Sequence, residues 1–116
     1  AFAKEDIEKG TTVDVSHVLL IPNKDWNDGI GNSILFNYCF QWNDPKYKGR
    51  YDNALPLGSC LFINHSYDPN LRYFYNHENL IIVFKAIKNI KKDEELTVNY
   101  NADPDDDSEM WFDVVE

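Results

Sequence analysis

The sequence lacks long apolar runs, clustered cysteines and an excess of basic charge. No apolar stretch in its 116 residues approaches the roughly 20 that a membrane-spanning helix needs. Cys39 and Cys60 show no metal-ligand spacing and no secretory signal is visible. We therefore expect two reduced core thiols, no metal, and an intracellular protein of the cytoplasm or the nucleus.

The charge balance bears on the kind of partner. The net charge of −9 argues against direct nucleic-acid binding, because phosphate contact needs a basic face. It suits a cationic partner such as a lysine-rich peptide, although solubility alone also explains it. Apolar residues make up 43% and aromatic residues 15% of the chain, which predicts one small packed domain.

The dominant hydrophobic period is two, which is typical of strands. Alternation of large apolar with other residues predicts strands over 34–42, 71–75 and 96–100, and 13–21 is a further candidate. Residues 80–87 are apolar on both faces and predict a buried strand. Turn-forming residues such as Glu8-Lys9-Gly10 separate these runs, and no window predicts a long amphipathic helix. The expected fold class is mostly β.

Two short segments carry polar groups suited to a site. Asn64-His65-Ser66 ends an apolar run, at a strand terminus where ligands are often held. Adjacent strand residues point apart, so Ser66 with His65 does not indicate a hydrolase. The second segment, 94–100, ends in Tyr100, whose ring can be buried while its tip stays polar. Taken alone, the first segment is better explained as a capped strand end and the second as one that ends in an ordinary core tyrosine.

Together the two segments resemble a known family. LFINHSYDPN at 61–70 resembles the NHSxxPN motif of SET domains, and DEELTVNY at 93–100 resembles their GEELTxxY motif. Phe2-Ala3 is similar to the start of the domain, and ALPLG at 54–58 is similar to a stretch in small bacterial and viral members. The chain thus resembles SET-domain protein-lysine methyltransferases over essentially its whole length.

This resemblance implies a fold of small curved sheets with a C-terminal pseudoknot that brings the two motifs together. Residues 1–100 would form the SET core, and residues 101–116 a flanking segment that completes the cofactor and lysine channel. The G-x-G that precedes the Phe-Ala pair in the family is not part of this sequence. Tyr67 stands where relatives often have cysteine, and the cysteine-rich C-terminal module of many relatives is missing.

The resemblance also implies an activity, the transfer of a methyl group from S-adenosylmethionine to a protein lysine, with S-adenosylhomocysteine as product. The implied catalytic residues are Tyr100 and Tyr38, the latter in YCFQW, which is similar to a YxFxW strand of the family. The implied cofactor-binding residues are Phe62, Asn64, His65, Tyr100 and Trp111. The implied substrate-binding residues are Tyr38, Tyr73 and Phe112.

Other functional classes stay open. A catalytically silent SET fold would serve as a peptide-binding or scaffold module, and a structural β-protein would bind neither cofactor nor peptide. The expected partner is a lysine-containing, basic protein or peptide, and a homodimer is an open alternative to a monomer. Tyr73 would limit the number of methyl groups if it lines the lysine channel, and is otherwise a core residue.

Overall fold

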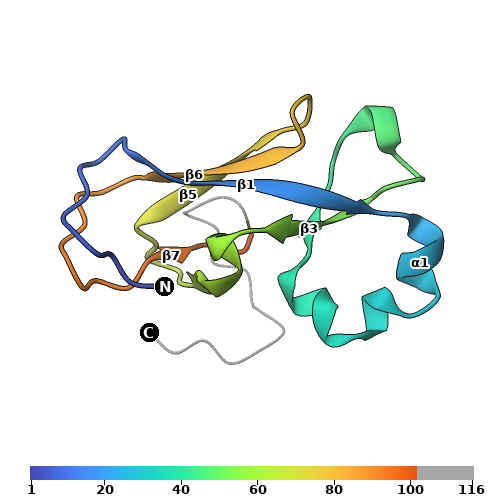
Figure 1. Cartoon of the computed structure of the whole chain (residues 1–116), viewed down its shortest axis with the longest axis horizontal. Helices are drawn as coiled ribbons and strands as arrows, with labels where there is room; N and C mark the ends of the chain where they lie inside the picture. Colours follow the sequence, from blue (N-terminus) through green and yellow to red (C-terminus); the bar gives the residue numbers. More distant parts are fainter. Residues whose placement is uncertain (102–116) are drawn as a thin grey trace. The chain divides into compact units, whose positions relative to one another are not determined.

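The computed structural model describes residues 1–101, which form a mostly β fold with short helical turns, and the mostly β class agrees with the prediction from the period-two alternation. The elements in chain order are β1 (Thr12–Ile21), α1 (Asn23–Asn27), the 3-10 turns η1 (Ile30–Asn32) and η2 (Ile34–Tyr38), β2 (Phe40–Gln41), η3 (Pro45–Tyr47), β3 (Asn53–Leu57), η4 (Ser59–Phe62), β4 (Asn64–His65), β5 (Leu71–Asn76), β6 (Ile81–Ala86) and β7 (Thr97–Val98) (Figure 1).

The chain divides into two compact units, here called unit 1 and unit 2. Unit 1 comprises Ala1–Val15, Phe62–Phe74 and the chain from Val83 on, and unit 2 comprises Ser16–Leu61 and Tyr75–Ile82. The hydrogen-bonded strand order of the larger sheet is β2-β3-β1-β6-β5, and β4 and β7 form a separate pair. The two predicted motifs fall together in unit 1, except for Leu61, which belongs to unit 2.

Unit 2 is built around β3. This strand pairs antiparallel with β1, where Leu19 faces Leu55, and with β2, where Phe40 faces Ala54. Trp42 is the largest side chain buried in this unit, at 1% exposure, and it meets the rings of Tyr75 and His77 edge-on. Figure 1 shows a series of short helical turns, coloured cyan to green, between β1 and β3.

The strand predicted over 34–42 is wrong for most of its length. Residues Ile34–Tyr38 form η2, and only Phe40–Gln41 is a strand. The side chain of Ser33 accepts a hydrogen bond from the amide of Leu35 and donates one to the carbonyl of Ile30, which stabilises a turn at this point. Ile34, Phe36 and Tyr38 are 70%, 46% and 40% exposed, so the alternation over 34–38 marks no buried face.

Strands β5 and β6 each bury one face. Leu71 and Tyr73 of β5 are buried while Arg72 and Phe74 are exposed, as the alternation predicts. Strand β6 forms as predicted, but only its Ile82, Phe84 and Ala86 side is fully buried. The prediction of burial on both faces is therefore wrong: on the other side Ile81 and Val83 are partly exposed and Lys85 is exposed.

The N-terminal segment is joined to the end of the described chain. Phe2 and Ile7 form antiparallel bridges with Glu95 and Ile90, and the amide of Leu96 donates to the carbonyl of Ala1 at 2.8 Å. These bonds bring the first residues of the chain beside the strand that leads to Tyr100.

Candidate functional site

The two sequence motifs meet in unit 1. Strands β4 and β7 pair in parallel, with Asn64 opposite Thr97 and His65 opposite Val98. The amide of Ser66 extends this pairing by donating to the carbonyl of Val98 at 2.9 Å. Figure 1 shows β7, coloured orange, beside the yellow-green segment that follows η4. Segments about thirty residues apart therefore form one short ladder, as the resemblance implies.

Tyr100 is attached to the first motif at both its main chain and its side chain. Its amide donates to Nδ1 of His65 at 2.9 Å, and its hydroxyl donates to the carbonyl of Ile63 at 2.8 Å. The His65 and Tyr100 rings lie with centroids 5.2 Å apart. Because the hydroxyl proton is directed at Ile63, the phenolic oxygen can only accept from any further group. Such an oxygen suits an amine hydrogen or a polarised methyl group.

Asn64 and His65 point in opposite directions, as neighbours on a strand do. His65 is buried at 7% exposure, and its contact with Tyr100 gives it a role in holding the site together. Asn64 is exposed, and its Nδ2 donates to a carboxylate oxygen of Glu95 at 2.8 Å. Glu95 received no role from the sequence, although it lies inside the second motif.

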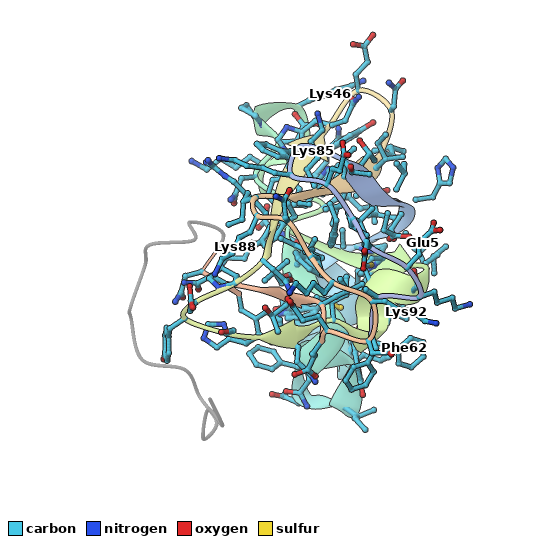
Figure 2. The ribbon with its side chains drawn as sticks, turned by 90° about the vertical axis from the view of Figure 1, so that its left-hand side faces the viewer. Glu5, Lys46, Phe62, Lys85, Lys88 and Lys92 are labelled. Carbon is cyan, nitrogen blue, oxygen red and sulfur yellow. The ribbon has the colours of Figure 1, made fainter. Side chains whose placement is uncertain are left out.

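Phe62 lies two residues before Asn64 and is 69% exposed, with its ring projecting outward (Figure 2). An exposed aromatic ring beside an exposed amide suits a ligand that has both a flat apolar part and polar groups. S-adenosylmethionine has this character, so the donor set present around β4 fits the expected cofactor.

Tyr73 is buried at 6% exposure, and its hydroxyl donates to the main-chain carbonyl of Tyr100 at 3.3 Å. Its ring also meets Phe84 edge-on, with centroids 5.8 Å apart. Tyr73 is thus packed in the core and in direct contact with Tyr100, the residue that ends the second motif. A core position for Tyr73 is therefore compatible with the predicted position in the lysine channel.

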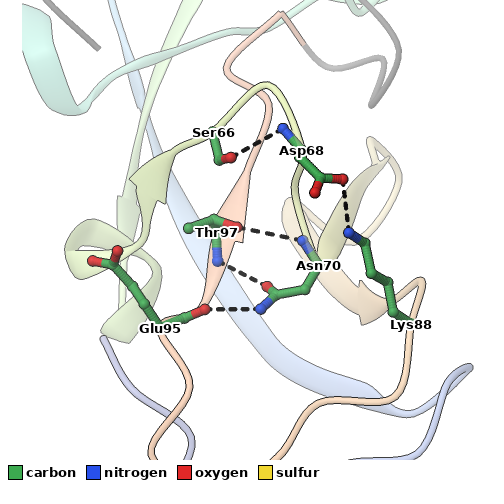
Figure 3. A network of polar contacts seen from close by, with 6 residues as sticks. All are labelled: Ser66, Asp68, Asn70, Lys88, Glu95 and Thr97. Atoms are coloured by element: carbon green, nitrogen blue, oxygen red, sulfur yellow. Dashed lines mark hydrogen bonds and ion pairs between the residues drawn. The ribbon is translucent and has the colours of Figure 1, made fainter. Parts of the chain in front are cut away.

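A buried asparagine not assigned to the site by the sequence joins the two motifs. Asn70, at 7% exposure, exchanges hydrogen bonds with the chain at Glu95 and Thr97 (Figure 3). The sequence predicts only a turn at 68–70. What could have pointed to this contact is that Asn70 closes the NHSxxPN motif.

Not all predicted site residues are brought together. Phe62, Asn64, His65, Tyr73 and Tyr100 all belong to unit 1. Tyr38 belongs to unit 2, where it is the last residue of η2 and does not lie in a strand, so its implied role in catalysis stays a prediction. Trp111 and Phe112 lie outside the described residues.

Other features constrain the chemistry of the described part. No group of three or more histidine, cysteine or acidic residues in 1–101 is arranged to hold a metal ion. Neither Cys39 nor Cys60 forms a disulfide, and burial raises the pKa of the Cys39 thiol. No helix within 1–101 is long and apolar enough to cross a membrane. Seven of the twenty acidic residues and no basic residue lie in 102–116, so residues 1–101 carry a net charge of only −2.

The fold and the paired motifs define a class, that of the SET methyltransferases, and comparison with known proteins agrees. The family profile of the SET domain matches residues 1–101. The chain belongs to the SET domain family. It is 28% identical over 111 residues to the histone-lysine N-methyltransferase, H3 lysine-37 specific, of Schizosaccharomyces pombe, covering 96% of this chain and 67% of that protein.

Solved structures show the same fold. A humanized mutant of the Chaetomium thermophilum polycomb repressive complex 2 aligns at 30% identity with a TM-score of 0.61, over 85% of this chain and 12% of that one. The Neurospora histone lysine methyltransferase DIM-5 aligns at 23% identity with a TM-score of 0.63, over 98% of this chain and 51% of that one. The second likeness shows the fold alone. This chain thus spans a small part of the first of these proteins and about half of the second.

Proposed function

We propose that this protein transfers a methyl group from S-adenosylmethionine to the side-chain amine of a protein lysine. The observation that carries the proposal is the attachment of Tyr100 to the first motif, at Nδ1 of His65 and at the carbonyl of Ile63. Together with membership of the SET domain family, it supports Tyr100 as the catalytic residue. The histone-lysine methyltransferase from fission yeast supports the same reaction class.

Bound S-adenosylmethionine would supply the reaction with an activated methyl group on a positively charged sulfur. Asn64, His65 and Phe62 are the proposed residues that hold it, with Trp111 of the C-terminal segment. The role proposed for His65 is carried by its main chain, because its ring is engaged with Tyr100. The exposed amide of Asn64 and the exposed ring of Phe62 are placed to meet a ligand directly.

Tyr100 acts on the incoming lysine by orientation. Methyl transfer is an in-line displacement, so the main requirement is to align the amine nitrogen with the methyl carbon. The lysine must be neutral to attack, and desolvation next to a positive sulfur lowers its pKa. The phenolic oxygen of Tyr100 accepts a hydrogen bond from the amine, because its own proton is donated to Ile63. Tyr38, Tyr73 and Phe112 are proposed to line the lysine channel, and no general base is needed from the chain.

The proposed substrate is a basic, lysine-containing protein, and the proposed location of the enzyme is the cytoplasm or the nucleus. Most of the net charge of this protein belongs to residues 102–116, which hold seven acidic residues and no basic residue. Electrostatic attraction of a basic peptide would therefore depend mainly on that segment, and should weaken with salt. No metal takes part in the proposed reaction.

The test is incubation of the purified protein with isotope-labelled S-adenosylmethionine and an array of lysine peptides, read by mass spectrometry. Calorimetry with S-adenosylmethionine runs in parallel. A labelled lysine together with cofactor binding supports the proposal. Cofactor binding without product on any peptide or histone would favour a catalytically silent SET fold, and no binding at all would leave a structural β-protein.

A further inference from the structure

We propose that Asn70 is a positioning residue. Its side-chain amide forms the hydrogen bonds that a neighbouring strand would form with the chain at β7, and thereby fixes the position of Tyr100. This inference rests on the proposed function, since it concerns the same site. It starts from the shortness of β7, which has two residues and a single parallel partner, β4. Parallel pairs are slightly weaker per residue than antiparallel ones, and short isolated pairs are only marginally stable.

The side chain of Asn70 reproduces the hydrogen bonds of a neighbouring strand. Its Nδ2 donates to the carbonyl of Glu95 at 2.8 Å, and its Oδ1 accepts from the amide of Thr97 at 2.9 Å. The main-chain amide of Asn70 adds a bond to Oγ1 of Thr97 at 3.3 Å. Both halves of the amide are used, so neither a carboxylate nor a hydroxyl can replace it.

The loop that carries Asn70 is itself anchored. The carbonyl of Asn70 accepts from the amide of Ile87 at 2.9 Å, and the amide of Asp68 donates to Oγ of Ser66 at 3.0 Å. Lys88 forms an ion pair with Asp68 at 2.7 Å (Figure 3). This pair is exposed and adds little by itself. Asn70 therefore connects a fixed loop to the strand that leads to the catalytic tyrosine.

Tyr100 follows Thr97 by three residues, so the position of Thr97 limits where the tyrosine begins. Between them, Oδ1 of Asn99 accepts from the amide of Asn101 at 3.0 Å and turns the chain after the strand. If the side-chain amide of Asn70 is lost, the chain at 95–97 loses two hydrogen bonds and keeps its pairing with β4, the bond from Leu96 to Ala1 and the bond from the main-chain amide of Asn70 to Thr97. We then expect the hydrogen bond from the Tyr100 amide to His65 to open more often. The Tyr100 hydroxyl should then be less well aligned with the substrate amine.

The test is Asn70→Asp, which keeps the shape of the side chain but removes both amide hydrogens. Asn89→Asp is the matched control, because Asn89 is exposed and its Oδ1 only accepts, from the amide of Lys9 at 2.8 Å. We expect turnover to fall about tenfold or more in Asn70→Asp, with the cofactor Kd and the peptide KM essentially unchanged. The control should match the wild type.

A double-mutant cycle with Tyr100→Phe separates positioning from general stability. If Asn70 acts through Tyr100, the double variant should be no slower than Tyr100→Phe alone. Additive losses, or a fall in cofactor affinity with unchanged turnover, would overturn the proposal. All rates are measured in single turnover and normalised to folded protein.

Amide hydrogen exchange gives a readout that does not need activity. Protection of the Tyr100 amide should drop in Asn70→Asp, while the amide of Ile90, which bonds to Ile7, stays protected. Unchanged protection at Tyr100 would refute the inference even if the protein proves not to be an enzyme. Should Asn70→Asp fail to fold, Thr97→Val removes one bond of the network and Thr97→Ser keeps it. The first should loosen the Tyr100 amide and the second should not, and equal protection in both would also overturn the proposal.

Discussion

The two units are stabilised by different kinds of polar contact. In unit 1 the hydrogen bonds of side chains join segments far apart in the sequence, such as His65 with Tyr100 and Asn70 with Glu95. In unit 2 such bonds also stabilise local turns, such as those capped by Ser33 and Asp44. Asn23 and Asp52 form a long-range pair in this unit. The structure of unit 1 therefore depends on specific hydrogen bonds between side chains distant in the sequence. The structure of unit 2 depends more on local turn-capping bonds and on a small apolar core.

The largest effect should come from the core of unit 2. Trp42 is 1% exposed, so Trp42→Ala should lower the free energy of unfolding by about 3–5 kcal/mol. Trp26→Ala is the control, because Trp26 is only partly buried and meets Phe36 at a ring separation of 6.1 Å. Urea unfolding followed by fluorescence and circular dichroism measures both. Equal losses in the two variants would contradict the view that Trp42 is the central residue of this unit.

The next effect concerns activity rather than stability. Tyr100→Phe removes the hydroxyl that donates to Ile63, and turnover should fall about 10²-fold because the amine loses its acceptor and alignment. The loss of stability should be about 1 kcal/mol, the usual contribution of one hydrogen bond. Mass spectrometry with a verified substrate gives the rate, and calorimetry should show retained cofactor binding.

The control for Tyr100→Phe is Tyr47→Phe in unit 2, where the ring meets Tyr51 edge-on at 5.5 Å. This variant should keep full activity. If Tyr100→Phe also keeps full activity, the tyrosine is an ordinary core residue and its proposed catalytic role is wrong.

The difference between the units also explains what the sequence could predict. Strands β1, β5 and β6 follow from alternation or from β-branched apolar runs, and the meeting of Asn64-His65 with Tyr100 follows from the family resemblance. The residues of η2 alternate equally well, yet they form a 3-10 turn. Period alone could not distinguish the two cases, because it does not report whether another element covers the apolar face.

The missed contacts in unit 1 have a different cause. Asn70 and Glu95 lie within the motifs, but their partners depend on which atoms face each other across β4 and β7. Asp93, by contrast, is a position whose backbone conformation could be anticipated from the motif. It stands where the family usually has glycine, and its φ of 72° lies in the left-handed region that glycine adopts most easily. Aspartate is among the few other residues that tolerate this region, which explains how the departure from the motif is accommodated.

A smaller effect tests whether Tyr73 belongs to the site as well as to the core. Its hydroxyl donates to the carbonyl of Tyr100. Tyr73→Phe should therefore free space next to the amine of the substrate lysine and leave the carbonyl of Tyr100 able to accept another hydrogen bond. Monomethylation should dominate in the wild type, and the variant should give several-fold more di- or trimethyl product, in line with a hydrogen bond of about 1 kcal/mol. Intact-mass analysis of a peptide with one lysine measures this ratio. An unchanged distribution, or trimethylation by the wild type, would leave Tyr73 with a core role alone.

The smallest effect is expected at an exposed carboxylate of unit 2. The amide of Gly49 and Nδ2 of Asn23 donate to the two oxygens of Asp52, each at 2.9 Å, and they hold the pKa of Asp52 below its usual range. A carboxylate whose pKa is lowered on folding stabilises the fold above its unfolded pKa, and that stabilisation disappears as the pH falls through the folded pKa.

Asp52→Asn should therefore lower the melting temperature at pH 6, because an amide can accept from only one of the two donors. As the pH falls through the folded pKa of Asp52, the wild type loses the same contribution, and the gap in melting temperature between the two proteins should narrow. Glu78→Gln removes an exposed carboxylate of the same unit and serves as the control. A gap between wild type and Asp52→Asn that stays constant from pH 6 to pH 2.5 would show that the contact between Asn23 and Asp52 does not depend on charge. Unit 2 would then be fixed by its turns and its core alone.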